Sequence, residues 1–364
     1  MKKEKMTTCV SLLIIILFSM SACSNLNTNV KTKDKSQINK FYDIMTLSSE
    51  GDGEKLYEVG NSLSNKINVS KIINVDYNLN NNTSVIRNFV SNGSNLTKTN
   101  LQIYNGNKEI TLNKSFSYSD VILSPKGTKI AFRSFSSDNL SSAEGVSIYS
   151  TVNDSKLKFD SDVLISGNLY TFLDDDNILY YGVTNGENDY GKIFDYNFKT
   201  NKKTVIYDKF NGYCTFFSAL ENGNLIFIEQ NDSGEVLNYY NKSNNSVSQI
   251  SSNLSDIYSY VVDEKNNIMY LLGDDSSTGS VQLYSINLTT LKLGRLTYDF
   301  PVTADKNGGM AINSLGQVYF CGFMDNSGNN SIFMYDHSTN STNLITTTPG
   351  QYHILTNWQF RSGT

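Results

Sequence analysis

The chain has 364 residues, of which 39% are hydrophobic and only 18% are charged, and its formal net charge is −5. This length allows one large all-β domain or two ordinary domains, and the 23 Tyr and 19 Phe are typical of a chain rich in β-strands. The negative charge opposes strong attraction to nucleic acid phosphates or anionic lipid headgroups, so we expect no nucleic acid partner.

The first residues are typical of an export signal. Lys2, Lys3 and Lys5 form a positively charged region, and the apolar run 10–20 is too short to span a bilayer comfortably. Small residues before Cys23 resemble the lipobox of bacterial lipoproteins. The resemblance implies that signal peptide 1–22 is removed and that Cys23 carries fatty acyl chains such as palmitate. These chains would anchor the protein to the outer face of the cell membrane. An ordinary secretory signal with an incidental Cys23 is the alternative.

Residues 23–39 are rich in Ser, Asn, Thr and Lys and nearly free of large apolar side chains. Such a segment cannot bury enough apolar surface to fold, so we expect a lipidated disordered tether. The folded domain is expected at 40–361, followed by a short tail at 362–364.

From residue 41 onward, short apolar runs alternate with turns rich in Asn, Ser, Gly and Asp, which is typical of an all-β domain. The clearest periodic feature is a strand that ends in a tyrosine. Successive tyrosines of this kind lie 44 to 51 residues apart: Tyr57, Tyr104, Tyr149, Tyr196, Tyr240, Tyr284 and Tyr335. A period of about 46 residues is the length of a four-stranded propeller blade. Because regular spacing on a strand indicates packing between blades, we interpret Tyr104, Tyr149, Tyr196, Tyr284 and Tyr335 as structural.

The other strands can be placed around each tyrosine strand. The innermost strands are expected near 72–77, 120–123, 169–173, 214–218, 258–262 and 310–313. The first set of three strands, within 42–69, has no innermost strand before it. Residues 354–360 form a strand with no further strand after it. The sequence therefore predicts a seven-bladed β-propeller of four-stranded antiparallel blades, in which the C-terminal strand completes the N-terminal blade and hides the sheet edges. A six-bladed ring is the alternative.

Residues 124–132 are the most specific motif in the chain, reading Ser-Pro-Lys-Gly-Thr-Lys-Ile-Ala-Phe. Pro125 presets φ for a tight turn, and Gly127 can take the positive φ that such a turn needs. The segment resembles the repeat of the TolB-like, WD40-like propeller family, although Lys126 replaces the usual Asp. The resemblance implies a propeller that serves as a binding platform, and it brings no catalytic residue with it.

The residue types that carry chemistry are sparse. His337 and His353 are isolated and have no zinc-ligand spacing near them, so we expect surface imidazoles, no metal site and no cofactor. Cys214 and Cys321 fall in blades that are not neighbours, which predicts two buried free thiols. The acidic run 174–176 could hold Ca²⁺ or form a carboxylate pair, but turns also demand Asp.

Aromatic and polar residues near the starts of the innermost strands are expected to surround the mouth of the central channel. They are suited to stacking on and hydrogen bonding to a ligand. These candidate ligand-binding residues are Phe116, Tyr118, Asp120, Tyr213, Tyr258, Tyr298, Phe300, Tyr352 and His353.

The sequence therefore favours a non-enzymatic, membrane-anchored lipoprotein whose propeller binds a protein, peptide or glycan partner. One alternative is an extracellular hydrolase or lyase that uses channel carboxylates such as Asp120, Asp256 and Asp299. A structural subunit of a larger envelope complex is a third possibility.

Overall fold

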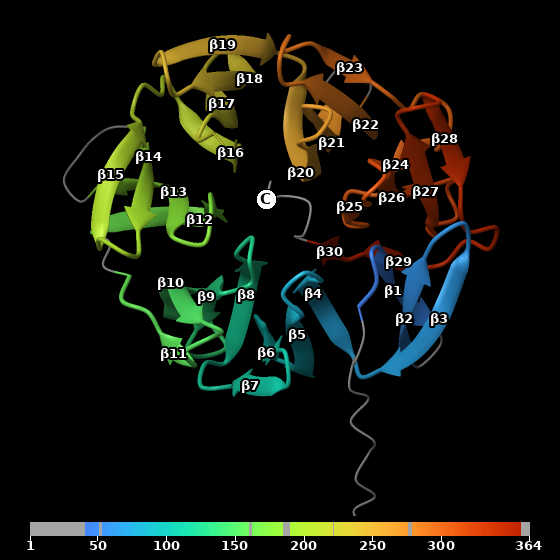
Figure 1. Cartoon of the computed structure of the whole chain (residues 1–364), viewed down its shortest axis with the longest axis horizontal. Helices are drawn as coiled ribbons and strands as arrows, with labels where there is room; N and C mark the ends of the chain where they lie inside the picture. Colours follow the sequence, from blue (N-terminus) through green and yellow to red (C-terminus); the bar gives the residue numbers. More distant parts are fainter. Residues whose placement is uncertain are drawn as a thin grey trace, which may run out of the picture. The chain divides into compact units, whose positions relative to one another are not determined.

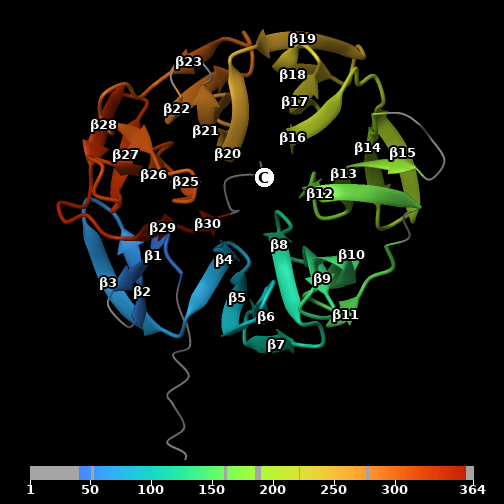
Figure 2. The ribbon, with the colours of Figure 1, turned by 180° about the vertical axis from the view of Figure 1, so that it is seen from behind.

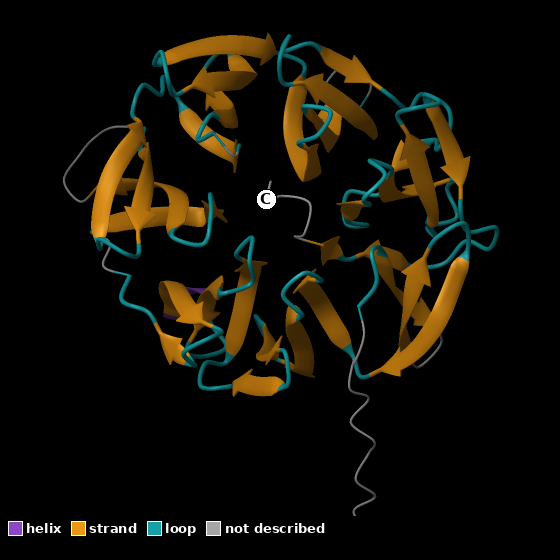
Figure 3. Cartoon of the chain, viewed as in Figure 1, coloured by secondary structure: helices purple, strands orange, loops and turns teal. Residues whose placement is uncertain are grey.

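The structure is a computed structural model of the chain. It describes residues 41–50, 53–159, 162–184, 190–220, 222–275 and 279–357, all of which belong to one structural unit, 38–364. The predicted signal peptide, Cys23, the tether and the C-terminal tail lie outside the described residues. Strands dominate the described residues, and the short 3₁₀ turn Leu140–Ser142 is the one helical element among them (Figure 3). Within these ranges no helix is long and apolar enough to cross a membrane.

The strands form seven antiparallel blades arranged in a ring (Figure 1). The first four blades hold β1 (Met45–Glu50), β2 (Gly53–Val59), β3 (Leu63–Val69) and β29 (Tyr352–Ile354); β4 (Ile72–Asn78), β5 (Thr83–Asn92), β6 (Thr97–Asn105) and β7 (Lys108–Leu112); β8 (Ser117–Leu123), β9 (Lys129–Phe135), β10 (Ala143–Ser150) and β11 (Ser155–Lys156); and β12 (Val163–Phe172), β13 (Asn177–Thr184), β14 (Lys192–Asn197) and β15 (Lys202–Tyr207).

The remaining three blades complete the ring. They hold β16 (Tyr213–Ala219), β17 (Leu225–Asn231), β18 (Gly234–Asn241) and β19 (Ser246–Ser251); β20 (Leu254–Asp263), β21 (Ile268–Asp275), β22 (Ser280–Asn287) and β23 (Leu293–Arg295); and β24 (Thr303–Ala304), β25 (Met310–Ile312), β26 (Val318–Phe323), β27 (Ser331–Asp336) and β28 (Ser341–Leu344). The prediction of seven blades is therefore confirmed, and the six-bladed alternative is wrong.

The ring closes where the C-terminal strand β29 pairs antiparallel with β1, as the sequence predicted. Both views place β29, near the C-terminal end of the described chain, beside β1, near its N-terminal end (Figure 1 and Figure 2). The pairing joins His353 to Leu47 and Ile354 to Thr46. Closure pairs strands that would otherwise be exposed edges.

The closing strand differs from the prediction of one strand over 354–360. It starts at Tyr352, ends at Ile354, and is followed by β30 (Thr356–Asn357), which pairs parallel with β4 of the next blade. Ile354 and Leu355 are adjacent and both fully buried, so the period-2 alternation of a strand is broken between them. The chain therefore passes from one blade to the next at this point.

The periodic tyrosines pack between blades, as predicted. Tyr196, Tyr284 and Tyr335 are buried in separate apolar clusters, and Tyr104 and Tyr149 pack against two others. The hydroxyl groups of three periodic tyrosines have a second role. The Tyr335 hydroxyl donates to the Asn340 side chain at 2.9 Å, and the same pattern recurs five residues after Tyr196 and Tyr240.

The acceptor of each tyrosine hydroxyl is a turn residue with positive φ: Asn201 (52°), Asn245 (54°) or Asn340 (50°). Asn tolerates this left-handed conformation better than most residues do. Tyr196, Tyr240 and Tyr335 therefore fill space between blades and also hold the turn that follows their own strand.

The 124–132 motif forms the corner between β8 and β9. Gly127 has φ of 69° and donates its N–H to the Ser124 carbonyl at 2.8 Å, which is the tight turn that the sequence predicts. The turn is held by Asp175 of the next blade, which accepts from the Ser124 hydroxyl at 2.6 Å and from the Lys126 N–H at 2.8 Å. Asp175 thus joins two neighbouring blades by hydrogen bonds, a contact we call the latch. It gives the acidic run 174–176 a structural role.

Replacing Asp175 with Ala is expected to lower the free energy of unfolding by about 1–3 kcal/mol, because the partly buried donors of the turn lose their acceptor. The matched control is Asp176→Ala, since Asp176 makes an exposed ion pair with Lys199 at 2.6 Å and should contribute less than about 1 kcal/mol. Urea denaturation of both variants measures the difference. Equal midpoints for the two variants would contradict the latch.

Candidate functional site

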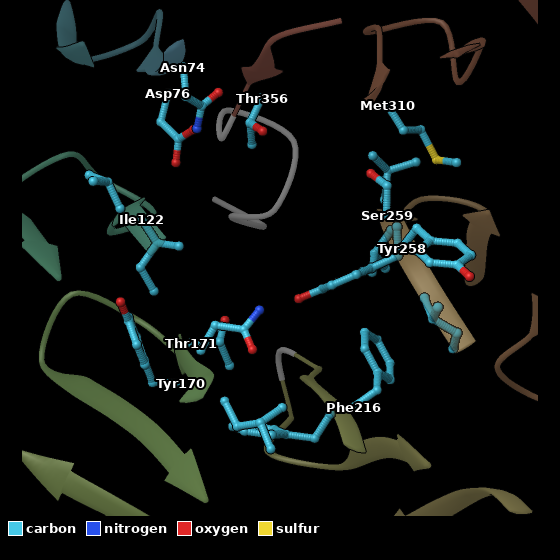
Figure 4. A pocket seen from close by; sticks show the side chains of 18 of the residues that line it. Asn74, Asp76, Ile122, Tyr170, Thr171, Phe216, Tyr258, Ser259, Met310 and Thr356 are labelled. Atoms are coloured by element: carbon cyan, nitrogen blue, oxygen red, sulfur yellow. The ribbon is translucent and has the colours of Figure 1, made fainter. Parts of the chain in front are cut away.

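Two adjoining cavities lie where the innermost strands of the blades converge. The channel cavity has a volume of about 350 Å³ and is lined by residues of several blades, among them Asp76, Thr171 and Tyr258 (Figure 4). The entrance cavity has a volume of about 400 Å³ and is lined by residues near the starts of these strands. The two cavities share Asn74, Val121, Tyr258, Ser259 and Thr356, so they form one continuous site.

The entrance cavity brings together three of the nine residues that the sequence proposed for ligand binding: Asp120, Tyr258 and His353. They come from β8, β20 and β29, which belong to three different blades. Arg87 of β5 and Lys306 line the same cavity. The Lys306 ammonium lies 5.6 Å from the centre of the Tyr258 ring, within the range of a cation–π contact.

His353 is held in one orientation by the loop 305–309. Its Nδ1 lies 2.7 Å from the Asn307 carbonyl oxygen, and the next N–H, that of Ile354, donates to the Gly308 carbonyl at 2.7 Å. Gly309 has φ of 71°, and a Cβ at this position would clash with the Ile354 carbonyl oxygen. The loop therefore needs glycine to approach β29 this closely.

The contact with Asn307 fixes the tautomer of His353. A carbonyl oxygen can only accept, so Nδ1 carries the proton and Nε2 of the neutral ring keeps its lone pair. Burial lowers the pKa of His353 below its ordinary value, and this effect outweighs the Asn307 hydrogen bond and the nearby Asp305 charge, which both raise it. His353 is therefore neutral at pH 7, with Nε2 available as a proton acceptor.

Asp120 is committed to an ion pair. Its Oδ2 lies 2.6 Å from Nε and 2.5 Å from Nη2 of Arg133, and its backbone has φ of 52°. The Tyr170 hydroxyl donates to the Asp120 carbonyl at 2.5 Å and fixes this unusual conformation across two blades. A carboxylate whose oxygen is held by two guanidinium nitrogens is not free to act on a substrate.

The other proposed ligand-binding residues line neither cavity. Tyr118 is buried and packs edge-on against Phe132, with ring centres 5.4 Å apart. Phe300 packs against Phe333, and the exposed Tyr298 lies beneath Arg295. Phe116, Tyr213 and Tyr352 are likewise placed elsewhere, with Tyr213 exposed beside Tyr190.

The carboxylates proposed for the hydrolase alternative are also separated. Asp256 and Asp299 are exposed and line neither the entrance cavity nor the channel cavity, so they do not face Asp120 across the site. The acidic residue of the channel cavity is instead Asp76, which is 3% exposed and accepts from the Asn74 side chain at 3.3 Å.

Sequence reasoning missed Arg87, Asp76 and Lys306. A signal was present for Arg87, because it directly follows the apolar pair Val85-Ile86. Asp76 has a similar signal, lying between Val75 and Tyr77 in an innermost strand. Lys306 lies in a loop, and nothing in its sequence context points to the site.

Cys214 and Cys321 are buried free thiols, as predicted, and burial raises the pKa of each thiol above its ordinary value. Among the described residues, no group of three His, Cys, Asp or Glu side chains is arranged to hold a metal ion.

Comparison with known proteins gives matches at the level of structure. No family model matches the chain, and no curated protein is similar to it in sequence. TolB from Acinetobacter baumannii is similar with a TM-score of 0.50 and 12% identity, over 85% of this chain and 80% of TolB. A puromycin hydrolase is similar with a TM-score of 0.55 and 7% sequence identity, over 86% of this chain and 55% of the hydrolase. Dipeptidyl peptidase 4 from Porphyromonas gingivalis is similar with a TM-score of 0.51 and 11% sequence identity, over 84% of this chain and 53% of the peptidase.

These matches correct the expectation of a non-enzymatic binding protein. Several of the similar structures are hydrolases, so the comparisons favour the hydrolase alternative. The expectation was wrong because blade repeats encode the scaffold, and the same scaffold carries binding proteins and enzymes. The chain spans about half the length of these hydrolases. At such low identity the likeness establishes the fold, and the chain is by fold a TolB-like seven-bladed β-propeller.

Proposed function

We propose that the chain is a hydrolase of peptides or aminoacyl amides and that the entrance cavity holds the bond to be cleaved. One observation carries the proposal: His353 lines this cavity as a neutral imidazole whose Nδ1–H is held by Asn307, which leaves Nε2 as a base. The similarity of the fold to a puromycin hydrolase and a dipeptidyl peptidase supports the choice of amide bonds.

The proposed reaction uses water as the nucleophile. His353 Nε2 takes a proton from a water molecule as the oxygen attacks the carbonyl carbon of the substrate. The Lys306 ammonium and the Tyr258 hydroxyl, which line the same cavity, are donors for the oxyanion that forms. The C–N bond then breaks, and the protonated His353 returns the proton to the leaving amine nitrogen.

The test is hydrolysis by the purified chain from residue 24 to its end. Puromycin, aminoacyl amides and a mixture of short peptides are incubated with the protein, and released amines are measured by mass spectrometry. We expect cleavage of at least one amide class above the rate in buffer. Absence of cleavage across the whole panel between pH 5 and 9 would overturn the proposed function.

We also propose that this activity is located outside the cytoplasm, on a lipid anchor at Cys23. The support is the sequence alone: a basic segment, an apolar run and small residues before Cys23. Fractionation of cells that express the full chain and its Cys23→Ala variant tests this location. Retention of both forms in the membrane fraction would contradict it.

A further inference from the structure

Arg87 is a cation of the entrance cavity whose hydrogen-bonding capacity is mostly unused. Its Nη1 donates to the Tyr118 carbonyl at a long 3.4 Å, and its Nε is buried without an acceptor. Among the described residues it makes no ion pair within 4.0 Å. Burial lowers the pKa of Arg87 more than the charges of Asp120 and Asp76 raise it. The guanidinium has therefore lost more contact with water than the neighbouring carboxylates make up for.

The two nearby carboxylates do not neutralise Arg87. Asp120 and Asp76 both act on Arg87 through their charge, but neither approaches it closely enough for an ion pair. Asp120 has its Oδ2 bound to two nitrogens of Arg133, and Asp76 lines the channel cavity, where it accepts from Asn74. Burying guanidinium N–H groups that have no acceptor costs free energy, and a ligand that supplies the acceptor removes this cost.

The entrance cavity also carries a second cation, Lys306, for which the described residues provide no carboxylate within 4.0 Å. Asp120 is the one carboxylate among the described residues that line this cavity, and it is already paired with Arg133. The unmatched charge of the cavity is thus positive, although the whole chain carries −5. This local sign is opposite to what the composition alone indicates.

We infer that Arg87 binds the free carboxylate of a ligand in the entrance cavity, so that the site selects peptides with an unblocked C-terminus. A guanidinium presents parallel N–H groups that match the two oxygens of a carboxylate. A C-terminal amide has only one oxygen and no charge, so it cannot make the same pair of hydrogen bonds. The volume of about 400 Å³ is sufficient for a short peptide. The peptide nature of the ligand rests on the proposed function, whereas the carboxylate preference rests on the contacts of Arg87.

Binding of acetyl-triglycine acid and acetyl-triglycine amide, measured by calorimetry on the chain from residue 24 to its end, tests this inference. We expect the acid to bind about tenfold or more tightly than the amide, since hydrogen bonds to a charged group are the strong ones. Arg87→Gln should remove this preference, while Arg87→Lys should keep part of it. Equal affinity of the wild-type protein for acid and amide would overturn the inference.

Two controls keep the result interpretable. Arg295→Gln makes the same chemical change at a residue outside both cavities, and the preference for the acid should persist. Thermal unfolding of each variant verifies that it is folded. Because the preference is read from affinities and not from cleavage, a protein that prefers the acid but cleaves nothing refutes only the proposed function. A protein that cleaves peptides without preferring the acid refutes only the inference about Arg87.

Discussion

Replacing Ile354 with Asp is expected to lower the free energy of unfolding by roughly 4 kcal/mol or more and to open the propeller ring. Ile354 is 1% exposed and belongs to an apolar cluster with Ile44, Tyr319 and Ile332, which come from the first and last blades. The Asp side chain would not make the apolar contacts of the Ile side chain, and its carboxylate would be buried among apolar groups. Opening the ring would then expose the edge of β1.

Ile354→Val is the matched control for this variant. It removes one methylene group and should cost about 0.5–1.5 kcal/mol with the strand pairing retained. Urea denaturation followed by circular dichroism gives both values, and size-exclusion chromatography detects association through the exposed edge. An Ile354→Asp protein as stable as the Ile354→Val protein would show that β29 does not close the ring.

Replacing His353 with Asn is expected to reduce amide hydrolysis by roughly a hundredfold or more, the usual contribution of a general base. The Asn side chain can still donate to the Asn307 carbonyl, but it has no counterpart of the Nε2 lone pair. The variant therefore removes the base while it preserves the contact that holds the loop. Release of amine from the best substrate of the panel measures the loss.

The pH dependence gives a second measure of His353. Because burial lowers its pKa, the wild-type rate should rise with pH through a value below the ordinary 6.5 and then level off. The variant His353→Asn should lose this rise. His337→Asn is the matched control, since His337 is exposed and follows β27 outside both cavities. An unchanged rate and pH profile in His353→Asn would exclude His353 as the base.

The same shift affects stability with a definite sign. The folded pKa of His353 lies below the unfolded one, so the unfolded chain binds more protons near pH 6. The stabilising effect of a neutral His353 is present above the unfolded pKa and is lost as the pH falls through the folded pKa. Acidification should therefore weaken the loop 305–309 and the closure at β29 together.

Most of the fold could be predicted from the sequence because its determinants are local and repeated. The turn at Gly127 follows from the need for positive φ, and the tyrosines recur because each fills the same gap between blades. The error at 354–360 arose where the local pattern stopped being periodic. Ile354 and Leu355 are both buried, and which blade the chain joins after them depends on contacts with Met45 and β4.

The site was predicted less completely, because its residues are brought together by the ring rather than by their spacing. Asp120, Tyr258 and His353 belong to three blades, and Arg87 and Lys306 to two others around the same cavity. The expected surface imidazole at His353 differs from its position against Asn307, which lies 46 residues earlier in the chain. Local sequence has no information on such a distant contact.

By itself, the sequence determined the number of blades, the position of most strands and the closure of the ring, since hydrophobic alternation and turn residues act over a few residues. Only the tertiary structure decided the tautomer of His353, the pairing of Asp120 with Arg133 and the unmatched charge of Arg87. These properties depend on distance and desolvation, which are set by the packing of blades far apart in the chain. The 124–132 motif illustrates the difference: its turn is encoded locally, and its latch to Asp175 exists only in the assembled ring.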